Sequence, residues 1–307
     1  MALLLLLKER NIPLHALSVD HGLRAESASE AAQVAAWCKA LDIAHTTLHW
    51  RHGDIGSGLP EKAREARYAL MFEWCRTHGI RHLLTAHHRD DQVETFLLRL
   101  LRGSGIEGLS GILPVSERQG IFLHRPLLAF SKERLIATLK AQNQQWIEDP
   151  SNRDMRYSRN ALRQSLDVLM DEDARQQISQ LTIFFQKFRN LLESKLSESI
   201  NLCLSTGETA PLLIHSLFMA QPPELKTRML HHICKDVGKH YQPIRSEKIL
   251  RLLGSIETGT GKHMLGGAVF YYRPRLSAWE ITRAKPLAAK ADIAQNNTLK
   301  QRTINAQ

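Results

Sequence analysis

Along the first half of the chain, short apolar runs alternate with longer segments that have the 3.6-residue apolar spacing of a helix. The apolar runs predict strands over 14–20, 43–50 and 81–86, and the longer segments predict helices over 25–41 and 60–78. Ser27-x-x-Glu30 has the pattern of a capping box, while Pro60 and Gly79 suit the start and the end of the second helix. Because strands that alternate with helices pair in parallel through right-handed crossovers, the pattern predicts a doubly wound α/β sheet.

The pattern changes near Leu166. Residues 167–180 are acidic and helical and lead through 181–195 into a second unit. In that unit the apolar spacing predicts amphipathic helices over 223–237 and 246–253. Gly266-Gly267 then suggests a pair of strands within 263–281. We therefore predict a first domain over 1–165, and a linker helix with a second, mainly helical domain over 166–285. Residues 286–307 are rich in Ala, Gln and Asn, which predicts a disordered tail.

Several titratable side chains gather where the strand over 81–86 ends. His87, His88, Asp90 and Asp91 follow the strand, and Glu94 lies on the helix that begins there. Asp91 and Glu94 are three residues apart, so their carboxylates share one face of the first helical turns, at the edge where open α/β sheets place their sites. One acid in a first turn is ordinary, because it complements the positive end of a helix. The whole group favours a functional site, whose carboxylate pair can hold an ammonium group or a metal.

Charge favours a polyanionic partner. The chain has 41 Lys and Arg residues against 31 Asp and Glu, a net charge of +10, and a pI near 9.6. Arg153, Arg156, Arg159 and Arg163 are spaced three, three and four apart, so on a helix they form one face. That face is predicted to bind nucleic-acid phosphates, with a solvated helix face as the alternative.

The cysteines and the first residues exclude some classes of protein. The four cysteines are far apart and form no C-x-x-C pair, so we expect reduced core thiols rather than disulfides or a zinc site. The apolar run over 1–7 is too short to cross a bilayer and lacks the flanks of a signal peptide, so we expect the buried first turns of a helix. These features predict a cytoplasmic protein that has no membrane association.

With these residues in place, the chain resembles the tRNA(Ile)-lysidine synthetases, which are N-type ATP pyrophosphatases with an adenine nucleotide alpha hydrolase-like fold. The resemblance rests on ordered blocks: Val19-Asp20-His21-Gly22-Leu23-Arg24, Glu61-x-x-Arg64-x-x-Arg67-Tyr68, the 86–95 string, Arg102-Gly103-x-Gly105, Arg125-Pro126-Leu127-Leu128, Trp146-x-Glu148-Asp149-Pro150-Ser151-Asn152 and Arg159-Asn160-x-Leu162-Arg163. Several blocks in one order make a specific match to this family.

The resemblance implies a reaction in two steps. ATP, with Mg²⁺, adenylates the C2 oxygen of the wobble cytidine in tRNA(Ile) with a CAU anticodon, and the amine of free lysine then displaces AMP to give lysidine. By position, Asp91 and Glu94 bind lysine, and with His87 they form the catalytic group. The implied ATP contacts are Val19, Asp20, Arg64, Arg67, His87 and Arg102, the implied tRNA contacts are Arg153, Arg156, Arg159 and Arg163, and no resident metal site is implied.

One departure from the family concerns the beginning of the chain. The family's phosphate loop, Ser-Gly-Gly-x-Asp-Ser, precedes a Met-Ala-Leu-Leu segment, whereas this sequence starts at Met1-Ala2-Leu3-Leu4. In a sheet of order 3-2-1-4-5 the missing first strand is central, so we expect the strands over 14–20 and 81–86 each to face an empty slot. The family's last C-terminal domain is also expected to be missing.

The departure leaves two alternatives to an active synthetase open. The chain as given is expected to bind tRNA and to form no lysidine, which would make it a catalytically inactive tRNA-binding remnant. A metal-dependent phosphohydrolase is the other alternative, because the neighbouring strand ends carry metal-ligand types: Asp20, His21, His87, His88, Asp90 and Asp91.

Overall fold

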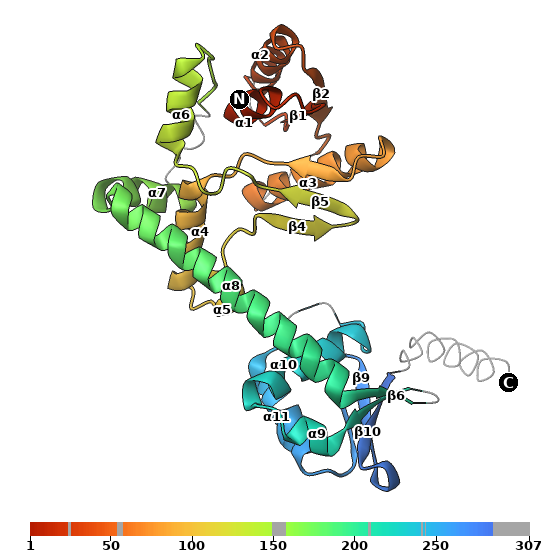
Figure 1. Cartoon of the computed structure of the whole chain (residues 1–307). Coiled ribbons are helices and arrows are strands. Elements are labelled where there is room, and N and C mark those ends of the chain that lie inside the picture. Colours follow the sequence, from red (N-terminus) through yellow and green to blue (C-terminus); the bar gives the residue numbers. More distant parts are fainter. Residues whose placement is uncertain are drawn as a thin grey trace, which may run out of the picture. The chain divides into compact units, whose positions relative to one another are not determined.

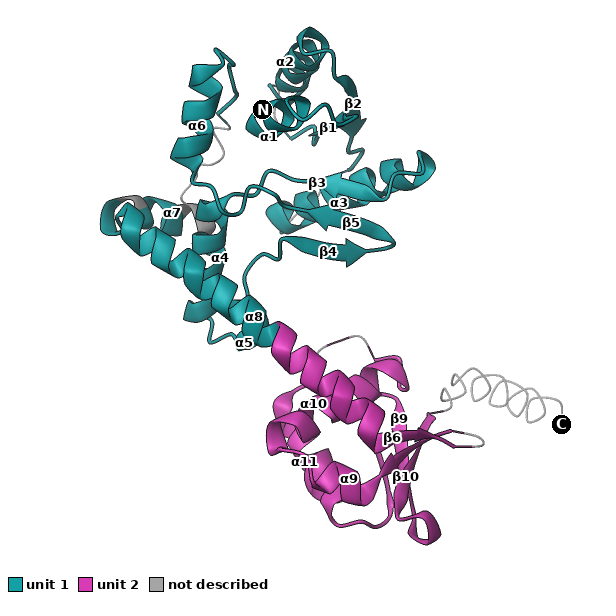
Figure 2. Ribbon diagram, in the orientation of Figure 1, with its two compact units in different colours: residues 1–189 teal, residues 190–307 magenta. Residues whose placement is uncertain are grey.

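The computed structural model describes residues 1–23, 26–53, 58–148, 158–207, 210–240, 242 and 244–284. The chain forms two compact units, residues 1–189 and 190–307 (Figure 2). The division falls inside helix α8 (Glu172–Cys203), whereas the sequence placed a domain boundary at residue 165. Arg153, Arg156 and the tail over 286–307 lie outside the described residues, as does the side chain of Arg159.

The first unit contains the helices and strands expected from the sequence (Figure 1). Those predicted in its first half are present, with ends displaced by no more than two residues: β1 (His15–Asp20), α2 (Ser27–Ala40), β2 (Ala44–His49), α3 (Leu59–Thr77) and β3 (His82–Leu84). They are joined by α1 (Ala2–Lys8), α4 (Arg89–Leu101), α5 (Ile106–Leu109), β4 (Val115–Arg118), β5 (Ile121–His124), α6 (Lys132–Ala141) and α7 (Ser158–Leu169). Ala2 and Leu5 of α1 are buried, which confirms the prediction for this segment.

Strand pairing in the first unit is parallel except at one edge. β1 pairs with β2 and β3 pairs with β5, both in parallel, while β4 pairs antiparallel with β5. Among the described residues the strands form two separate sheets, β1-β2 and β3-β5-β4. One edge of β1 and one edge of β3 therefore have no strand partner there, as the sequence predicted.

Helix α3 packs against both sheets. Its buried residues, Tyr68, Met71, Phe72 and Cys75, share a cluster with Leu17, Val19 and Leu48 of the first sheet and with Leu83, Ile121 and Leu123 of the second. Both sheets thus lie against one helix. Buried side chains of α3, β3 and β5, and partly buried ones of β1 and β2, therefore hold the two sheets in one apolar cluster.

The structure differs from the sequence prediction at two local features. The hairpin of β4 and β5 was not predicted; its turn residues Gln119 and Gly120 both have positive φ, 55° and 77°, the backbone of a two-residue type I′ turn. The capping-box prediction at Ser27 is wrong, because α2 begins at Ser27 itself and has no side-chain cap. The hydroxyl of Ser27 instead donates to Oδ1 of Asp20 at 2.7 Å.

The second unit is built around an antiparallel sheet with strand order β6-β7-β10-β9-β8. Its elements after α8 are β6 (Leu204–Thr206), β7 (Pro211–Ile214), α9 (His215–Met219), α10 (Pro223–Asp236), α11 (Ser246–Glu257), β8 (Lys262–Leu265), β9 (Ala268–Arg273), the 3₁₀ turn η2 (Pro274–Leu276) and β10 (Ala278–Arg283). The two predicted helices and the strand pair around Gly266-Gly267 are confirmed. Strands β6, β7 and β10 add to that pair. None of the helices in the described ranges is long and apolar enough to span a membrane.

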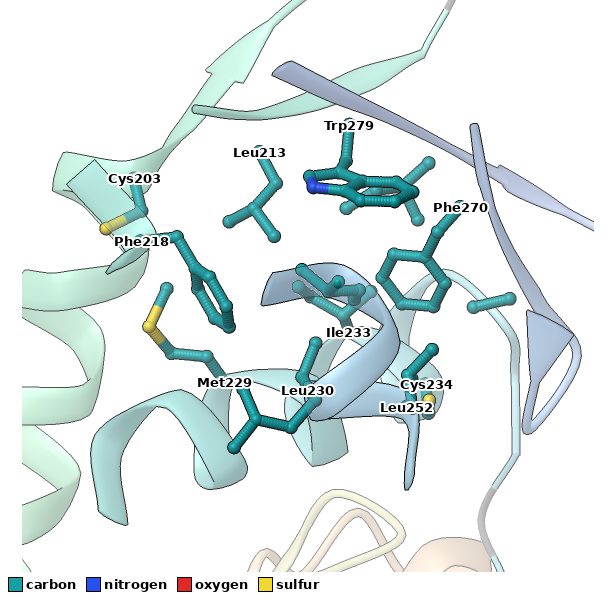
Figure 3. Close-up of a cluster of buried hydrophobic side chains, with 14 of the residues drawn as sticks. Cys203, Leu213, Phe218, Met229, Leu230, Ile233, Cys234, Leu252, Phe270 and Trp279 are labelled. Atoms are coloured by element: carbon teal, nitrogen blue, oxygen red, sulfur yellow. The ribbon is translucent and has the colours of Figure 1, made fainter. Parts of the chain in front are cut away.

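Large side chains fill the core of the second unit (Figure 3). Trp279, Phe270 and Phe218 are fully buried there against α10 and α11. Gly238, which follows α10, lies close to the β8–β9 turn, since an added Cβ would lie 2.0 Å from the carbonyl oxygen of Gly266. Only glycine fits at that approach, so helix α10 and the β8–β9 turn are held in one arrangement.

The four cysteines are free and buried, as predicted. Burial raises the pKa of each thiol, that of Cys234 to about 11. Because the thiolate is the reactive form, we expect no cysteine of the folded protein to react with an aromatic disulfide reagent at pH 8, and all to react in denaturant. The measurement is absorbance of the released thiol. A rapid reaction of one equivalent in the folded protein would contradict the packing described for these thiols.

Candidate active site

Helix α4 positions the side chains that follow β3. His88 is its N-cap, and the backbone N–H of His88 donates to Oδ2 of Asp91 at 3.0 Å in a capping box. Val93 and Phe96 are buried, which fixes the face of α4 that carries the acidic residues. Asp91 therefore acts as a cap through Oδ2, while its Oδ1 lies 3.9 Å from Nη2 of Arg163.

Asp90 joins three helices of the first unit. Its Oδ2 accepts from the backbone N–H of Lys132 at the start of α6 (2.9 Å), and its Oδ1 accepts from Nη1 of Arg175 in α8 (3.1 Å). Nδ1 of His88 lies 3.2 Å from Oδ2. Burial alone would raise the pKa of Asp90, but the hydrogen bonds from His88 and Lys132 and the nearby cations outweigh it and hold this pKa well below its usual range.

His88 shows the reciprocal effect. Burial alone would lower its pKa, but the hydrogen bond to Asp90 and the charges of Asp90, Asp91 and Glu94 raise it above the ordinary value. The two groups thus stabilise one another as an ion pair, and Asp90 is engaged in holding helices together rather than facing a substrate.

We expect Asp90→Asn to lower the free energy of unfolding by about 3–5 kcal/mol, because it removes the buried anion that both His88 and Arg175 contact. Ionised Asp90 contributes fully above its unfolded pKa near 3.8, and this is lost as the pH falls through the lower folded value. Protonated His88 contributes fully below 6.5, and this is lost as the pH rises through the higher folded value. Urea denaturation should therefore show the largest difference from wild type between those two pH values.

Glu73→Gln provides the control for this prediction, because Glu73 forms an exposed pair with Arg76 on one helix. Such pairs contribute little, so this variant should unfold close to wild type at every pH. A pH-independent effect of Asp90→Asn would contradict the assigned ion pair.

The carboxylates of Asp91 and Glu94 lie within reach of one cation. Nε of Arg163 in α7 is 2.5 Å from Oε1 of Glu94, and its Nη2 is 3.9 Å from Oδ1 of Asp91. Glu94 is almost fully buried, whereas the side chain of Arg163 is 28% exposed. The two carboxylates thus lie on one face of α4, and the guanidinium of Arg163 lies against that face.

His87 follows β3, and two further predicted residues, Asp20 and Arg67, lie at the carboxyl end of β1. Oγ1 of Thr85 lies 2.9 Å from Nδ1 of His87, which orients its ring. Asp20 accepts from Ser27 and from the backbone N–H of Gly22, and these hydrogen bonds lower its pKa. Arg67 reaches the same end of β1 from α3, with Nη2 3.2 Å from Nε2 of His21.

The other predicted ATP contacts are more dispersed. Arg64 lies over the ring of Tyr68, 5.2 Å from its centroid, one turn from Arg67 on α3. The side chain of Val19 packs into the core cluster under α3. Arg102 is the C-cap of α4, about 16 Å along the helix from Asp91, so α4 separates these two residues.

A resident metal site gains no support from the described residues. Within those ranges no three or more His, Cys, Asp or Glu side chains are grouped so that they could hold a metal ion. Asp90 and Asp91 instead pair with His88 and with arginines. A metal-dependent phosphohydrolase, the alternative considered from the sequence, would need those oxygens to bind its metal. The arrangement therefore does not favour that alternative.

Sequence reasoning missed two arginines of this region. Arg175 binds Asp90, and Arg89, itself 5% exposed, donates to Glu172 and Gln176 at the start of α8. Their partners lie more than 80 residues away in the sequence, so no local spacing indicates them. Lys226 of α10, in the second unit, is likewise buried and pairs with Glu257 at 2.8 Å.

Comparisons with known proteins agree with the fold and the motifs. Residues 1–169 match the PP-loop domain family. The tRNA(Ile)-lysidine synthase of Bradyrhizobium diazoefficiens is 40% identical over 250 residues, covering 78% of this chain and 69% of that protein. The synthase of Bradyrhizobium sp. BTAi1 is 36% identical, covering 83% and 77%. That of the Wolbachia endosymbiont of Brugia malayi is 35% identical, with 74% of this chain and 54% of that protein covered.

A solved structure supports the fold alone. The U34-tRNA thiolase NcsA of Methanococcus maripaludis, determined with its [4Fe-4S] cluster, superposes with a TM-score of 0.52 at 12% identity, covering 61% of this chain and 67% of that one. The PP-loop match and the identities to the synthases together show that this chain belongs to the tRNA(Ile)-lysidine synthase family.

Proposed function

We propose that the chain acts in tRNA modification, as the ligase that joins lysine to C2 of the wobble cytidine of tRNA(Ile) with a CAU anticodon. The observation that carries this proposal is the cation-binding pair of Asp91 and Glu94, at the edge of a PP-loop fold, in a chain 40% identical to a tRNA(Ile)-lysidine synthase. Because the substrate is tRNA, the reaction is placed in the cytoplasm.

The chemistry requires activation before ligation. The C2 oxygen of cytidine is a poor leaving group until ATP adenylates it and pyrophosphate departs. An amine of lysine then forms the C2–N bond while the C2–O bond breaks, AMP leaves with the electron pair, and the nitrogen loses a proton. Asp91 and Glu94 hold an ammonium of lysine, which two carboxylates attract strongly where water is partly excluded. We propose that His87, whose ring is oriented by Thr85, would lie beside the nucleotide and the base.

ATP contacts are proposed at the carboxyl end of β1 and on α3. Arg64 and Arg67 suit phosphate oxygens, since a guanidinium donates two parallel hydrogen bonds. Mg²⁺ is bound in such sites by one or two carboxylates together with substrate phosphates. Asp20, with its side chain 10% exposed at the end of β1, fits as that carboxylate. The ion would neutralise the departing pyrophosphate.

tRNA is proposed to bind through Arg153, Arg156 and Arg159, which precede or begin α7. Phosphate contacts release counterions, so affinity should fall with salt with a log–log slope of about −0.7 to −0.9 per contact. We expect Arg153→Gln with Arg156→Gln to make this slope shallower by about 0.7–0.9 per residue replaced. Filter binding across a salt series measures it. An unchanged slope would assign these arginines to a solvated face.

The function is tested with tRNA, ATP and labelled lysine, followed by analysis of the nucleosides. The chain is assayed alone and with the family's Ser-Gly-Gly-x-Asp-Ser loop fused ahead of Met1. We expect the protein with the fused loop to form labelled lysidine, in a reaction that depends on ATP and on cytidine at the wobble position, so a tRNA with a GAU anticodon should remain unlabelled. tRNA binding without lysidine from either protein would instead support the remnant.

A further inference from the structure

Arg64 is an exposed arginine of α3 whose guanidinium lies on an aromatic ring. The guanidinium carbon is 5.2 Å from the centroid of Tyr68, a distance at which a cation is attracted to the face of a ring. Within the described ranges the side chain of Arg64 forms neither an ion pair nor a hydrogen bond. Its five N–H donors are therefore available to a ligand.

The ring of Tyr68 is itself held in place. Tyr68 is 7% exposed, and its ring centroid lies 5.8 Å from that of Phe72 in the apolar cluster under α3. Burial lowers the pKa of Arg125, and a hydrogen bond with the hydroxyl of Tyr68 opposes that effect. Nη1 of Arg125 also donates to the carbonyl oxygen of Leu113 at 2.7 Å. Arg64 thus lies on a ring that is fixed by packing at its face and by Arg125 at its hydroxyl.

These residues lie beside the proposed position of the nucleotide. Arg125 directly follows β5, and the carbonyl oxygen of His124 accepts from the backbone N–H of Thr85, whose hydroxyl orients His87. The charge of Arg64 adds to burial in lowering the pKa of Arg125, so the two cations share one positive region. Neither guanidinium pairs with a carboxylate of the described part of the chain. Such a region suits a phosphate group, because a guanidinium matches the geometry of phosphate oxygens.

We propose that Tyr68 is a positioning residue, whose ring holds the guanidinium of Arg64 where it binds a phosphate group of ATP. The inference rests on the proposed function, in which ATP is used in the first step. An arginine side chain in solvent samples many rotamers, and ordering it on binding lowers the affinity for a ligand. Contact with a buried ring orders the guanidinium before ATP arrives, so less affinity is lost.

The test measures ATP binding by variants of Tyr68. ATP is titrated into the full chain, without and with the fused phosphate loop, while tRNA and lysine are omitted. Tyr68→Met fills the space with a flexible apolar side chain that has no ring face. It should weaken ATP binding by about 2- to 30-fold, the range that a cation–π contact gives. Tyr68→Phe keeps the ring and should bind ATP close to wild type, and it provides a result if Tyr68→Met does not fold.

A double-mutant cycle separates positioning from a structural role. Arg64→Gln should weaken ATP binding by about 10- to 150-fold, the effect of a hydrogen bond between charged groups. In that background Tyr68→Met should have no further effect, because the ring has no guanidinium left to hold. The KM for lysine, measured in the protein with the loop, should keep its wild-type value in the Tyr68 variants.

Phe72→Met is the matched control, because Phe72 is a buried aromatic residue of the same cluster and lies one turn from Tyr68. It should lower the melting temperature and leave the affinity for ATP unchanged. A loss of ATP affinity in Phe72→Met equal to that in Tyr68→Met would overturn the proposal, since general packing would then account for both.

Three other results would also overturn it. Equal effects of Tyr68→Met with and without Arg64 would show that Tyr68 does not act through Arg64. A loss of ATP affinity in Tyr68→Phe as large as in Arg64→Gln would show that the ring does not hold the guanidinium. Wild-type ATP affinity in Arg64→Gln would remove both residues from the ATP site, while lysidine formation would keep the proposed function intact. If the coupling is found but no lysidine forms, the proposed function fails and the role of Tyr68 in ATP binding stands.

Discussion

Asp91→Asn and Glu94→Gln are each expected to raise the lysine KM by about 30- to several-thousandfold, while tRNA-dependent ATP–pyrophosphate exchange stays measurable. The loss corresponds to about 2–5 kcal/mol, because one buried carboxylate no longer faces the ammonium. Glu94 should show the larger effect, since its side chain is 2% exposed and that of Asp91 is 16%. Asp91→Asn also alters the cap that binds the backbone of His88.

The measurement is steady-state lysidine formation against lysine concentration, in the protein that carries the phosphate loop, together with isotope exchange between ATP and pyrophosphate. Exchange reports the first step and KM reports the second. Glu133→Gln is the matched control, because Glu133 is an exposed acid in the first turn of α6. If both carboxylate variants kept the wild-type dependence on lysine, this face of α4 would not be the lysine site.

A segment fused ahead of Met1, with an apolar strand followed by Ser-Gly-Gly-x-Asp-Ser, is expected to raise the melting temperature by roughly 10–20 °C and to permit lysidine formation. Within the described ranges β1 and β3 each have an unpaired edge, and both sheets pack on α3. A strand between them would make roughly five further net hydrogen bonds of about 1 kcal/mol each. For a domain of this size each kcal/mol shifts the midpoint by about 2–4 °C.

Calorimetry and nucleoside analysis check the two parts separately. A matched segment with proline at the centre of its strand cannot complete the ladder, so it should give little stabilisation. A segment with an intact strand but Ala in place of the loop glycines should stabilise without supporting catalysis, because backbone N–H groups no longer cradle phosphate. A melting temperature unchanged by the intact strand would show that this strand does not pair with β1 and β3.

The sequence predicted what local spacing determines. The apolar periodicity of 43–50 and 60–78 located β2 and α3 to within one residue, and the three-residue spacing of Asp91 and Glu94 placed both carboxylates on one face. The sequence did not show which of two possible partners a side chain would bind. Ser27 had the pattern of a cap, but the carboxylate of Asp20 accepts its hydroxyl because the end of β1 lies beside the start of α2.

Long-range partners account for most of what the sequence could not predict. Asp90 binds groups 42 and 85 residues away, and Arg163 pairs with Glu94 across 69 residues. In a helical pattern, Arg163 is indistinguishable from the neighbouring arginines of the predicted phosphate-binding face. The packing of α7 on α4 shows that Arg163 faces Glu94.

The contacts that Asp90 makes with three helices affect the kinetics of folding. Its contacts with α6 and α8 require three helices to be in place, so they form after most of the chain has organised. Interactions that form after the transition state slow unfolding and leave the folding rate nearly unchanged. Asp90 should therefore have a low φ-value. Its contacts should slow the unfolding of the first unit more than they speed its folding.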